Sequence, residues 1–202
     1  MSSKRKLHHI WVKLRPLSYW YFLILAVISL LVGIYALRAN NLTSVRLHEK
    51  VMAVDKENGD VEKALQELRE HIHSHMNANL ASGPTAIKPP VQLKHRYERL
   101  VEAERERVSA TNQRVYTDAQ AICERRFPAG SGSTGRIPCI EAYVEEHGIK
   151  QKPIPDAMYK FDFVAPRWSP DLAGFSFLFA GFFGLMFIVR FAAEIWLKRQ
   201  FE

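Results

Sequence analysis

The sequence lacks the short motifs by which catalytic sites are most often identified. It contains no glycine-rich phosphate-binding loop, no H-E-x-x-H zinc motif and no G-x-S-x-G nucleophile motif. Nothing in the chain predicts a reaction, a catalytic residue or a cofactor, so we do not expect an enzyme.

Charged residues are absent from two long stretches, one near each end of the chain. Residues 17–37 are rich in Leu, Ile, Val and aromatic residues, and residues 172–189 are rich in Phe. At about 1.5 Å per residue, helices of such lengths suit a hydrocarbon core of roughly 30 Å. Because a chain in lipid must satisfy its own backbone hydrogen bonds, both stretches predict transmembrane α-helices.

Each stretch also has an alternative reading. The first could be a cleaved signal peptide, although its apolar run is long and residues 37–40 make a poor cleavage site. The second could be the buried core helix of a soluble protein, which its uncharged, Phe-rich composition disfavours.

The region between the two stretches lacks an excess of either charge. The formal net charge is +7, from 28 cations and 21 acids, but five cations precede residue 17 and three follow residue 189. The middle region is therefore nearly neutral, which argues against nucleic acid as a partner.

The charge at the two ends predicts the orientation in the membrane. Residues 1–16 form a basic tail without acids, and residues 190–202 carry three more cations. Short cationic flanks stay in the cytoplasm. We therefore expect a multi-pass protein of the cytoplasmic (inner) membrane, with both termini in the cytoplasm and residues 38–171 outside.

The outer region has mainly helical periodicity. We expect the first membrane helix to continue to about Glu57 and further helices over about 61–80, 91–127 and 138–148, followed by an extended segment around 159–163. The predicted fold class is mainly α, with two transmembrane helices flanking a small extracytoplasmic antiparallel helical bundle.

The longest of these helices carries a narrow apolar seam, formed by Val101, Val108, Val115 and Ile122 at seven-residue spacing. The alternate seam positions, Tyr97, Glu104, Thr111 and Asp118, are mostly polar. Such a seam favours packing within the chain over a dimeric coiled coil, although an oligomer remains open.

Cys123 and Cys139 are the only cysteines, and they flank a Gly/Ser-rich loop. In an oxidising outer compartment the pair predicts a disulfide. The alternative is two unrelated thiols.

His71, His73 and His75 form an H-x-H-x-H run. Only His71 and His75 share a helical face, and a zinc or copper site needs further ligands. Ordinary polar histidines are the simpler interpretation, so we predict no metal site and keep His71 and His75 as metal candidates.

Two runs in the long helix resemble motifs of the LemA family. The first is Val-Gln-Leu-Lys-His-Arg-Tyr at 91–97, and the second begins with Val-Tyr-Thr-Asp-Ala at 115–119 and ends in Arg-Phe-Pro at 126–128. The resemblance implies a bacterial protein with a membrane anchor and an outward helical bundle, and it assigns no residue a role. In that family the motifs lie on different helices, whereas here they share one. The second apolar stretch and the cysteine pair also depart from its pattern. The whole chain otherwise resembles uncharacterised two-span membrane proteins of small-genome bacteria.

The leading functional hypothesis is a non-catalytic module, anchored in the lipid bilayer, that binds a protein partner in the membrane or envelope. A sensor or accessory subunit that relays a signal to a partner is the second hypothesis. A metal-binding protein that uses His71 and His75 is the third.

Overall fold

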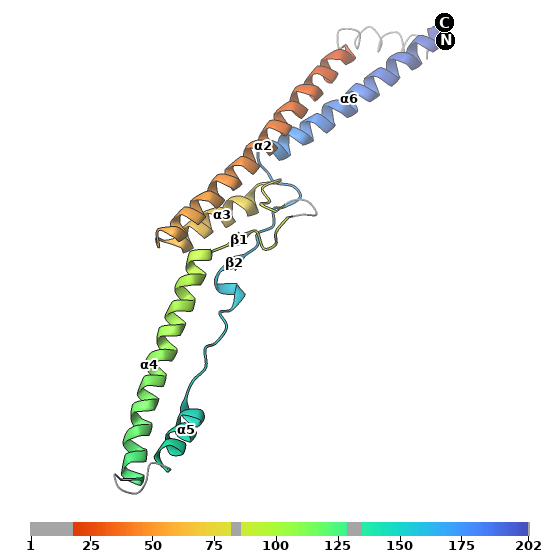
Figure 1. Ribbon diagram of the computed structural model, residues 1–202. Helices are drawn as coiled ribbons and strands as arrows, with labels where there is room; N and C mark the ends of the chain where they lie inside the picture. Colours follow the sequence, from red (N-terminus) through yellow and green to blue (C-terminus); the bar gives the residue numbers. More distant parts are fainter. Residues whose placement is uncertain (1–17, 82–85, 129–134, 202) are drawn as a thin grey trace. The chain divides into compact units, whose positions relative to one another are not determined.

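The computed structural model describes residues 18–81, 86–128 and 135–201, so the basic tail at 1–16 lies outside the described residues. The protein is mainly α-helical, as the sequence predicts (Figure 1). Its elements are α2 (Tyr19–Lys56), α3 (Val61–Ser74), β1 (Val91–Gln92), α4 (Lys94–Arg126), α5 (Arg136–His147), the 3₁₀ turn η1 (Asp156–Met158), β2 (Lys160–Phe161) and α6 (Leu172–Phe201).

The chain forms two compact units. The first contains α2 as far as Val51, the segment from Val61 to Ile87 that includes α3, and the segment from Asp162 onward that includes α6. The second contains the end of α2, from Met52, and residues 88–161. Residues 38–171 thus contribute to both units.

In the first unit, α2 and α6 form an antiparallel pair, and the uncharged stretches lie within these two helices from Tyr19 and from Leu172 onward. The ring of Tyr19 lies 6.0 Å from that of Phe187 and 5.5 Å from that of Phe191. Near the other end, the backbone at Gly33 faces the ring of Phe177, and a β-carbon at this position would lie 3.2 Å from it. A side chain at position 33 would crowd this contact.

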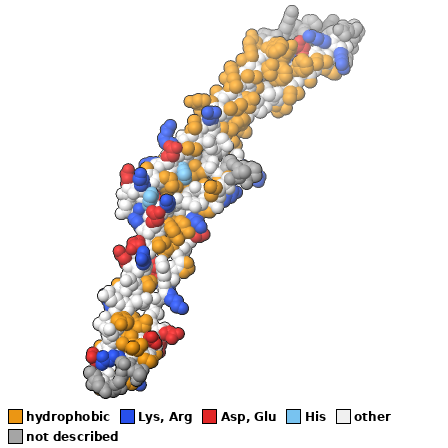
Figure 2. Space-filling model, viewed as in Figure 1, with side chains coloured by type: hydrophobic (Ala, Val, Ile, Leu, Met, Phe, Trp, Pro, Cys, Tyr) orange, Lys and Arg blue, Asp and Glu red, His pale blue; other side chains and the backbone are white. Residues whose placement is uncertain are grey.

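The outward faces of α2 and α6 are coated with large apolar side chains (Figure 2). Within the most apolar window of each helix, only 11% of α2 and 17% of α6 is buried. The core helix of a soluble protein would be mostly buried, so this reading of the second stretch does not fit its surroundings. By length and composition, both helices can span a membrane.

Helix α3 returns along the part of α2 that follows its uncharged stretch (Figure 1). A turn at Asn58-Gly59 precedes it, and Asn58 takes a left-handed conformation with φ of 56°. The apolar face expected from the sequence is buried, with Leu68 and Ile72 fully inaccessible, and Lys50 of α2 pairs with Glu67 of α3. The helix ends at Ser74, before the expected Leu80, because the following residues bond to α2 instead.

In the second unit, Asp55 near the end of α2 caps the first turn of α4. Its buried carboxylate accepts the backbone N–H groups of His95 at 3.0 Å and Arg96 at 2.8 Å. Arg99 donates to the same carboxylate at 2.9 Å and to the Asp55 carbonyl at 2.9 Å. Leu93, at the N-cap position, supplies no side-chain bond. Asp55 on α2 instead accepts two of the N–H groups that the first turn of α4 leaves unpaired.

Before α4, the structure corrects one expectation. Val91 and Gln92 were expected to begin the long helix, but they form β1, which pairs antiparallel with β2 in the register Val91–Phe161 and Gln92–Lys160. The extended segment around 159–163 is confirmed in part by β2. Val91 is not part of the helix because its backbone pairs with Phe161 of β2. That strand lies seventy residues later, so the sequence around α4 gives no sign of it.

Helix α4 has two partners in the second unit. Helix α5 packs antiparallel to the end of α4, and residues 149–159, here named the strap, return along α4 toward β2. The side chain of Asn112 donates to the Ile149 carbonyl at 2.9 Å and accepts the Ile149 N–H at 2.8 Å. The ring of Tyr97 lies 4.6 Å from that of Tyr159, tilted by 43°. Asn112 and Tyr97 of α4 therefore bind an extended segment of the same chain.

Candidate functional site

The first candidate site is a polar network in the first unit, centred on Asn40 and Asp171. The side chain of Asn40 donates to Asp171 Oδ2 at 2.8 Å and to the Met76 carbonyl at 3.2 Å. The Met76 N–H donates to Ser169 Oγ at 2.9 Å. These bonds join α2, the end of α3 and the segment before α6, and we call them the Asn40–Asp171 network.

Three asparagines extend this network along α2. The side chain of Asn77 donates to the Leu37 carbonyl at 3.3 Å, and that of Asn41 lies 3.5 Å from the Asn79 carbonyl. Asn79 Oδ1 in turn accepts the Ala165 N–H at 2.8 Å. The residues after α3 and before α6 are thus fixed to the first turns of α2 beyond its uncharged stretch.

Asp171 has a second role, because its Oδ1 accepts the Gly174 N–H at 2.9 Å and so caps α6. Burial raises the pKa of Asp171. The hydrogen bonds from Gly174, Asn40 and Ser169 and the charge of His75 lower it, and the net pKa lies below the ordinary value. The carboxylate is therefore held in its charged form.

The structure places His71 and His75 next to this network. Their rings stack at 4.4 Å. His71 Nε2 lies 3.1 Å from the Asn40 carbonyl, and His75 Nδ1 lies 3.0 Å from the His71 carbonyl. One nitrogen of each ring is thus engaged by backbone. Among the residues that the structure describes, no group of three or more His, Cys, Asp or Glu side chains has a metal-binding arrangement.

The second candidate site is the end of the α4–α5 pair, where Cys123 and Cys139 form the expected disulfide, with an S–S distance of 2.01 Å. Two further contacts close this end. Arg136 donates to the Phe127 carbonyl at 3.1 Å, beyond the last turn of α4. The Phe127 ring lies so close to Gly135 that a β-carbon there would be 2.8 Å away. The Gly/Ser loop itself, at 129–134, lies outside the described residues.

An open groove of about 410 Å³ lies beside the disulfide. Both helices line it, and apolar side chains show at this end of the α4–α5 pair in the space-filling view (Figure 2). Its lining residues are Ile122, Arg126, Phe127, Gly135, Pro138, Cys139, Ala142, Tyr143 and Glu146. No side chain of α5 is fully buried, so the groove leaves apolar surface accessible to a partner.

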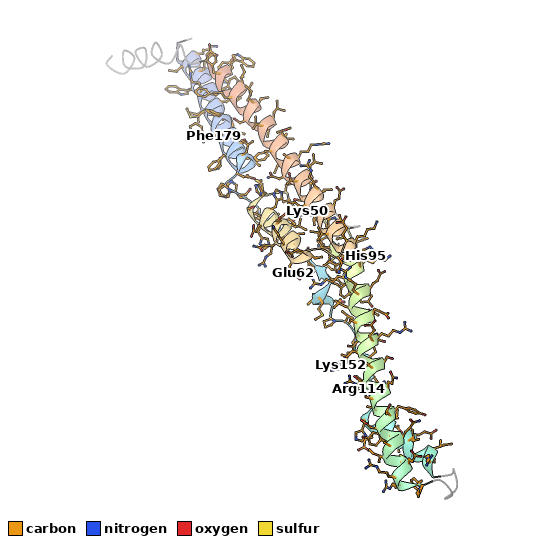
Figure 3. All side chains as sticks on the ribbon, turned by 90° about the vertical axis from the view of Figure 1, so that its left-hand side faces the viewer. Lys50, Glu62, His95, Arg114, Lys152 and Phe179 are labelled. Atoms are coloured by element: carbon orange, nitrogen blue, oxygen red, sulfur yellow. A yellow bond between two sulfur atoms is a disulfide. The ribbon has the colours of Figure 1, made fainter. Side chains whose placement is uncertain are left out.

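Glu104 fastens the strap to the middle of α4, and Lys152 lies beside that helix (Figure 3). The Glu104 carboxylate accepts two bonds from Arg107, each 2.8 Å long, and the Lys152 N–H at 3.0 Å. The bonds from Arg107, followed by that from Lys152, lower the pKa of Glu104 to about 2. The charged Glu104 carboxylate thus occupies one of the alternate seam positions, where a coiled coil would need an apolar side chain.

Sequence reasoning found Cys123, Cys139, His71 and His75 but missed Asn40, Asp55, Asn112 and Asp171. These four act through hydrogen bonds to residues distant in the chain. One signal was available for Asp55, since α4 begins without a capping side chain of its own.

Comparisons with protein-family models, with curated proteins and with solved structures find no match to this chain. The resemblance to the LemA family stays a prediction from the motifs quoted above.

Proposed function

We propose that the protein is a non-catalytic interaction module, anchored in a bacterial cytoplasmic membrane by α2 and α6, that binds a protein partner of the membrane or envelope. In this proposal both termini are cytoplasmic and the region between the membrane-spanning parts of α2 and α6 lies outside. The observation that carries the proposal is the disulfide-closed groove on the α4–α5 pair.

The membrane part of the proposal is supported by the exposed apolar coat of α2 and α6. In water such a coat would be costly, at about 25 cal/mol per Å² of apolar surface. The orientation is supported by the cationic flanks and by the disulfide, because disulfides persist in oxidising compartments.

The binding part of the proposal is supported by the construction of the groove. Ile122, Pro138 and Tyr143 provide apolar contact area, and Arg126 and Glu146 provide opposite charges on the lining. The disulfide, the Arg136 bond and the Phe127–Gly135 contact hold the two helices together, so a partner would meet a preformed surface.

Photocrosslinking in intact cells tests this proposal. A photoreactive residue at Tyr143, in the groove, should give one discrete protein adduct. The same residue at Gln120, an exposed α4 position outside the groove, should give none. Ile122→Glu should abolish the Tyr143 adduct while the protein keeps its disulfide. Equal labelling from both positions, or an adduct that survives Ile122→Glu, would rule out the groove as the binding surface.

A second candidate function is the relay of a signal through the membrane, which the Asn40–Asp171 network favours. The network bonds residues of the outer region to α2 and to the start of α6. A partner that displaces these residues would therefore act on both helices.

Crosslinking at the opposite end of α2 and α6 tests the relay. With cysteines replacing Tyr19 and Phe191, whose rings lie 5.5 Å apart, the rate of disulfide formation should change when Asp171→Ala is added. Asp162→Ala, at an exposed position of the same unit, is the matched control. An unchanged rate in the Asp171 variant would exclude the relay.

A further inference from the structure

We propose that the segment from Val164 to Ser169, just before α6, is an interfacial anchor that lies among the lipid headgroups of the outer leaflet. The inference rests on the proposed membrane location and adds a lipid-binding surface outside the spanning helices. The segment is held at the depth of the lipid headgroups, and the side chains that it exposes suit the bilayer surface.

The level of the segment follows from its hydrogen bonds. The uncharged stretch of α2 ends at Leu37, and Asn40 and Asn41 lie about 5–6 Å farther along the helix. On each side of the hydrocarbon core, the headgroup region is roughly 5–8 Å thick. Asn40 and Asn41 are therefore at headgroup level in the proposed membrane.

Both ends of the segment are fixed to that level. Asp171, two residues after the segment, bonds to Asn40, and Ala165 bonds to Asn79, whose carbonyl faces Asn41. Ser169 is buried and accepts the Met76 N–H, so the inner side of the segment is held as well. The residues between these anchors cannot move far from the headgroup region without breaking the bonds.

The segment exposes the residue types that interfaces favour. Val164 is 70% exposed and Trp168 is 49% exposed, although large apolar side chains gain from leaving water. Arg167 is also exposed and provides a cation for lipid phosphates. Tryptophan concentrates at membrane interfaces because its ring is apolar and its N–H is polar.

The exposed surface is continuous with the apolar face of α6. The Trp168 ring meets the Phe175 ring edge to face, with centroids 6.3 Å apart. Leu172 and Phe175 on the first turn of α6 are both exposed. A lipid that covers these two residues would extend directly onto Trp168, which favours the bilayer over a separate protein as the occupant.

Fluorescence quenching in vesicles tests the anchor. A variant with Trp168 as its only tryptophan, made with Trp11→Phe, Trp20→Phe and Trp196→Phe, should be quenched most by phospholipids brominated close to the headgroup. Lipids brominated deep in the chains should quench it less, and aqueous iodide should quench it several-fold less than free tryptophan. Quenching by iodide alone would overturn the anchor.

A second variant, with Trp20 as its only tryptophan, separates the anchor from the membrane proposal. Trp20 lies on the exposed face of α2, so brominated lipids should quench it too. If they quench Trp20 but not Trp168, the anchor is wrong and the spanning helices stand. If they quench neither, the membrane location itself is wrong.

A labelled cysteine gives an independent readout if the tryptophan variants fold poorly. The native cysteines are paired, so Val164→Cys can carry a single environment-sensitive dye. Its emission should shift to shorter wavelength in vesicles and be quenched by spin-labelled lipid. Gln66→Cys is the matched control, because the Lys50–Glu67 pair holds that part of α3 about 20 Å beyond Leu37. The same response at both positions would contradict a local anchor.

Discussion

The protein contains two antiparallel helix pairs, which differ in where their apolar side chains lie and in the bonds that fix one end of the pair. In the α2–α6 pair the large apolar side chains face outward, and polar groups such as Asn40 and Asp171 bond to one another at one end. In the α4–α5 pair the outer surface is polar, the apolar seam is narrow, and a covalent bond closes the end.

The two arrangements suit different solvents, lipid for the α2–α6 pair and water for the α4–α5 pair. A pair of helices in lipid gains nothing from hiding apolar side chains, so polar bonds at its end are sufficient to fix its neighbours. A two-helix pair in water buries too little apolar surface to be stable alone. The disulfide and the strap supply the stability that the small core of α4 and α5 lacks.

Removing the disulfide should have the largest effect. In a Cys123→Ser/Cys139→Ser variant, we expect the free energy of unfolding of the second unit to fall by about 3 kcal/mol, because the unfolded loop is no longer closed. Thermal unfolding of the full chain in detergent, followed by hydrogen exchange in α4 and α5, measures the loss. Exchange in α2 and α6 provides the control. Equal loss of protection in both helix pairs would contradict the comparison.

The second prediction concerns the polar bonds of the first unit. Asp171→Ala removes the α6 cap and the acceptor of Asn40, so we expect a loss of about 2 kcal/mol. Asp171→Asn keeps a side-chain oxygen and should lose less. The midpoint of thermal unfolding in detergent measures both variants. An unchanged midpoint for Asp171→Ala would mean that the network does not stabilise the helix pair.

The third prediction concerns the strap. Asn112→Ala removes both hydrogen bonds to Ile149, at about 1 kcal/mol each, and should release the strap from α4. Trypsin should then cleave after Lys150 roughly thirtyfold faster than in the native protein, because each 1.4 kcal/mol corresponds to a factor of ten and the two bonds together contribute about 2 kcal/mol. Gln113→Ala, at the exposed neighbouring position, is the control. Equal cleavage rates in the two variants would show that Asn112 does not hold the strap.

The smallest expected effect is a pH dependence confined to acid conditions. The pKa of Glu104 is lowered to about 2 in the folded protein, so its contribution is complete above the ordinary pKa of about 4.3 and is lost as the pH falls toward 2. The amide resonance of Lys152 should therefore titrate with a midpoint near pH 2, and Arg107→Gln should raise that midpoint. A Lys152 midpoint near 4.3 in the native protein would contradict the bonded carboxylate.

The helices and the disulfide could be predicted from the sequence because their signals are local. The helical periodicity over about 61–80 and the two uncharged stretches are each apparent within a short part of the chain. The pairing of β1 with β2 could not, since Val91 and Phe161 meet only after the chain between them has folded. The early end of α3 at Ser74 could not be predicted either, because Met76 and Asn77 bond to residues of α2 that are distant in the sequence.

The candidate sites were harder to predict than the fold. The cysteines and histidines stand out by residue type. The Gly/Ser-rich loop between the cysteines indicated that they meet, and the four-residue spacing of His71 and His75 indicated a shared helical face. Glu104 was read as an obstacle to a dimer seam, whereas the structure gives it the strap as a partner. Polar residues on a narrow apolar seam can thus indicate that an extended segment binds there, although the sequence does not say which one.

We propose that α2 and α6 cross a membrane with both termini in the cytoplasm and the region between them outside. A reporter that is active only in the cytoplasm, fused after Glu202 in one protein and inserted between Gly130 and Gly135 in another, tests it most directly. We predict activity from the fusion at Glu202 and none from the insertion. Activity from the insertion and none from the fusion would contradict it.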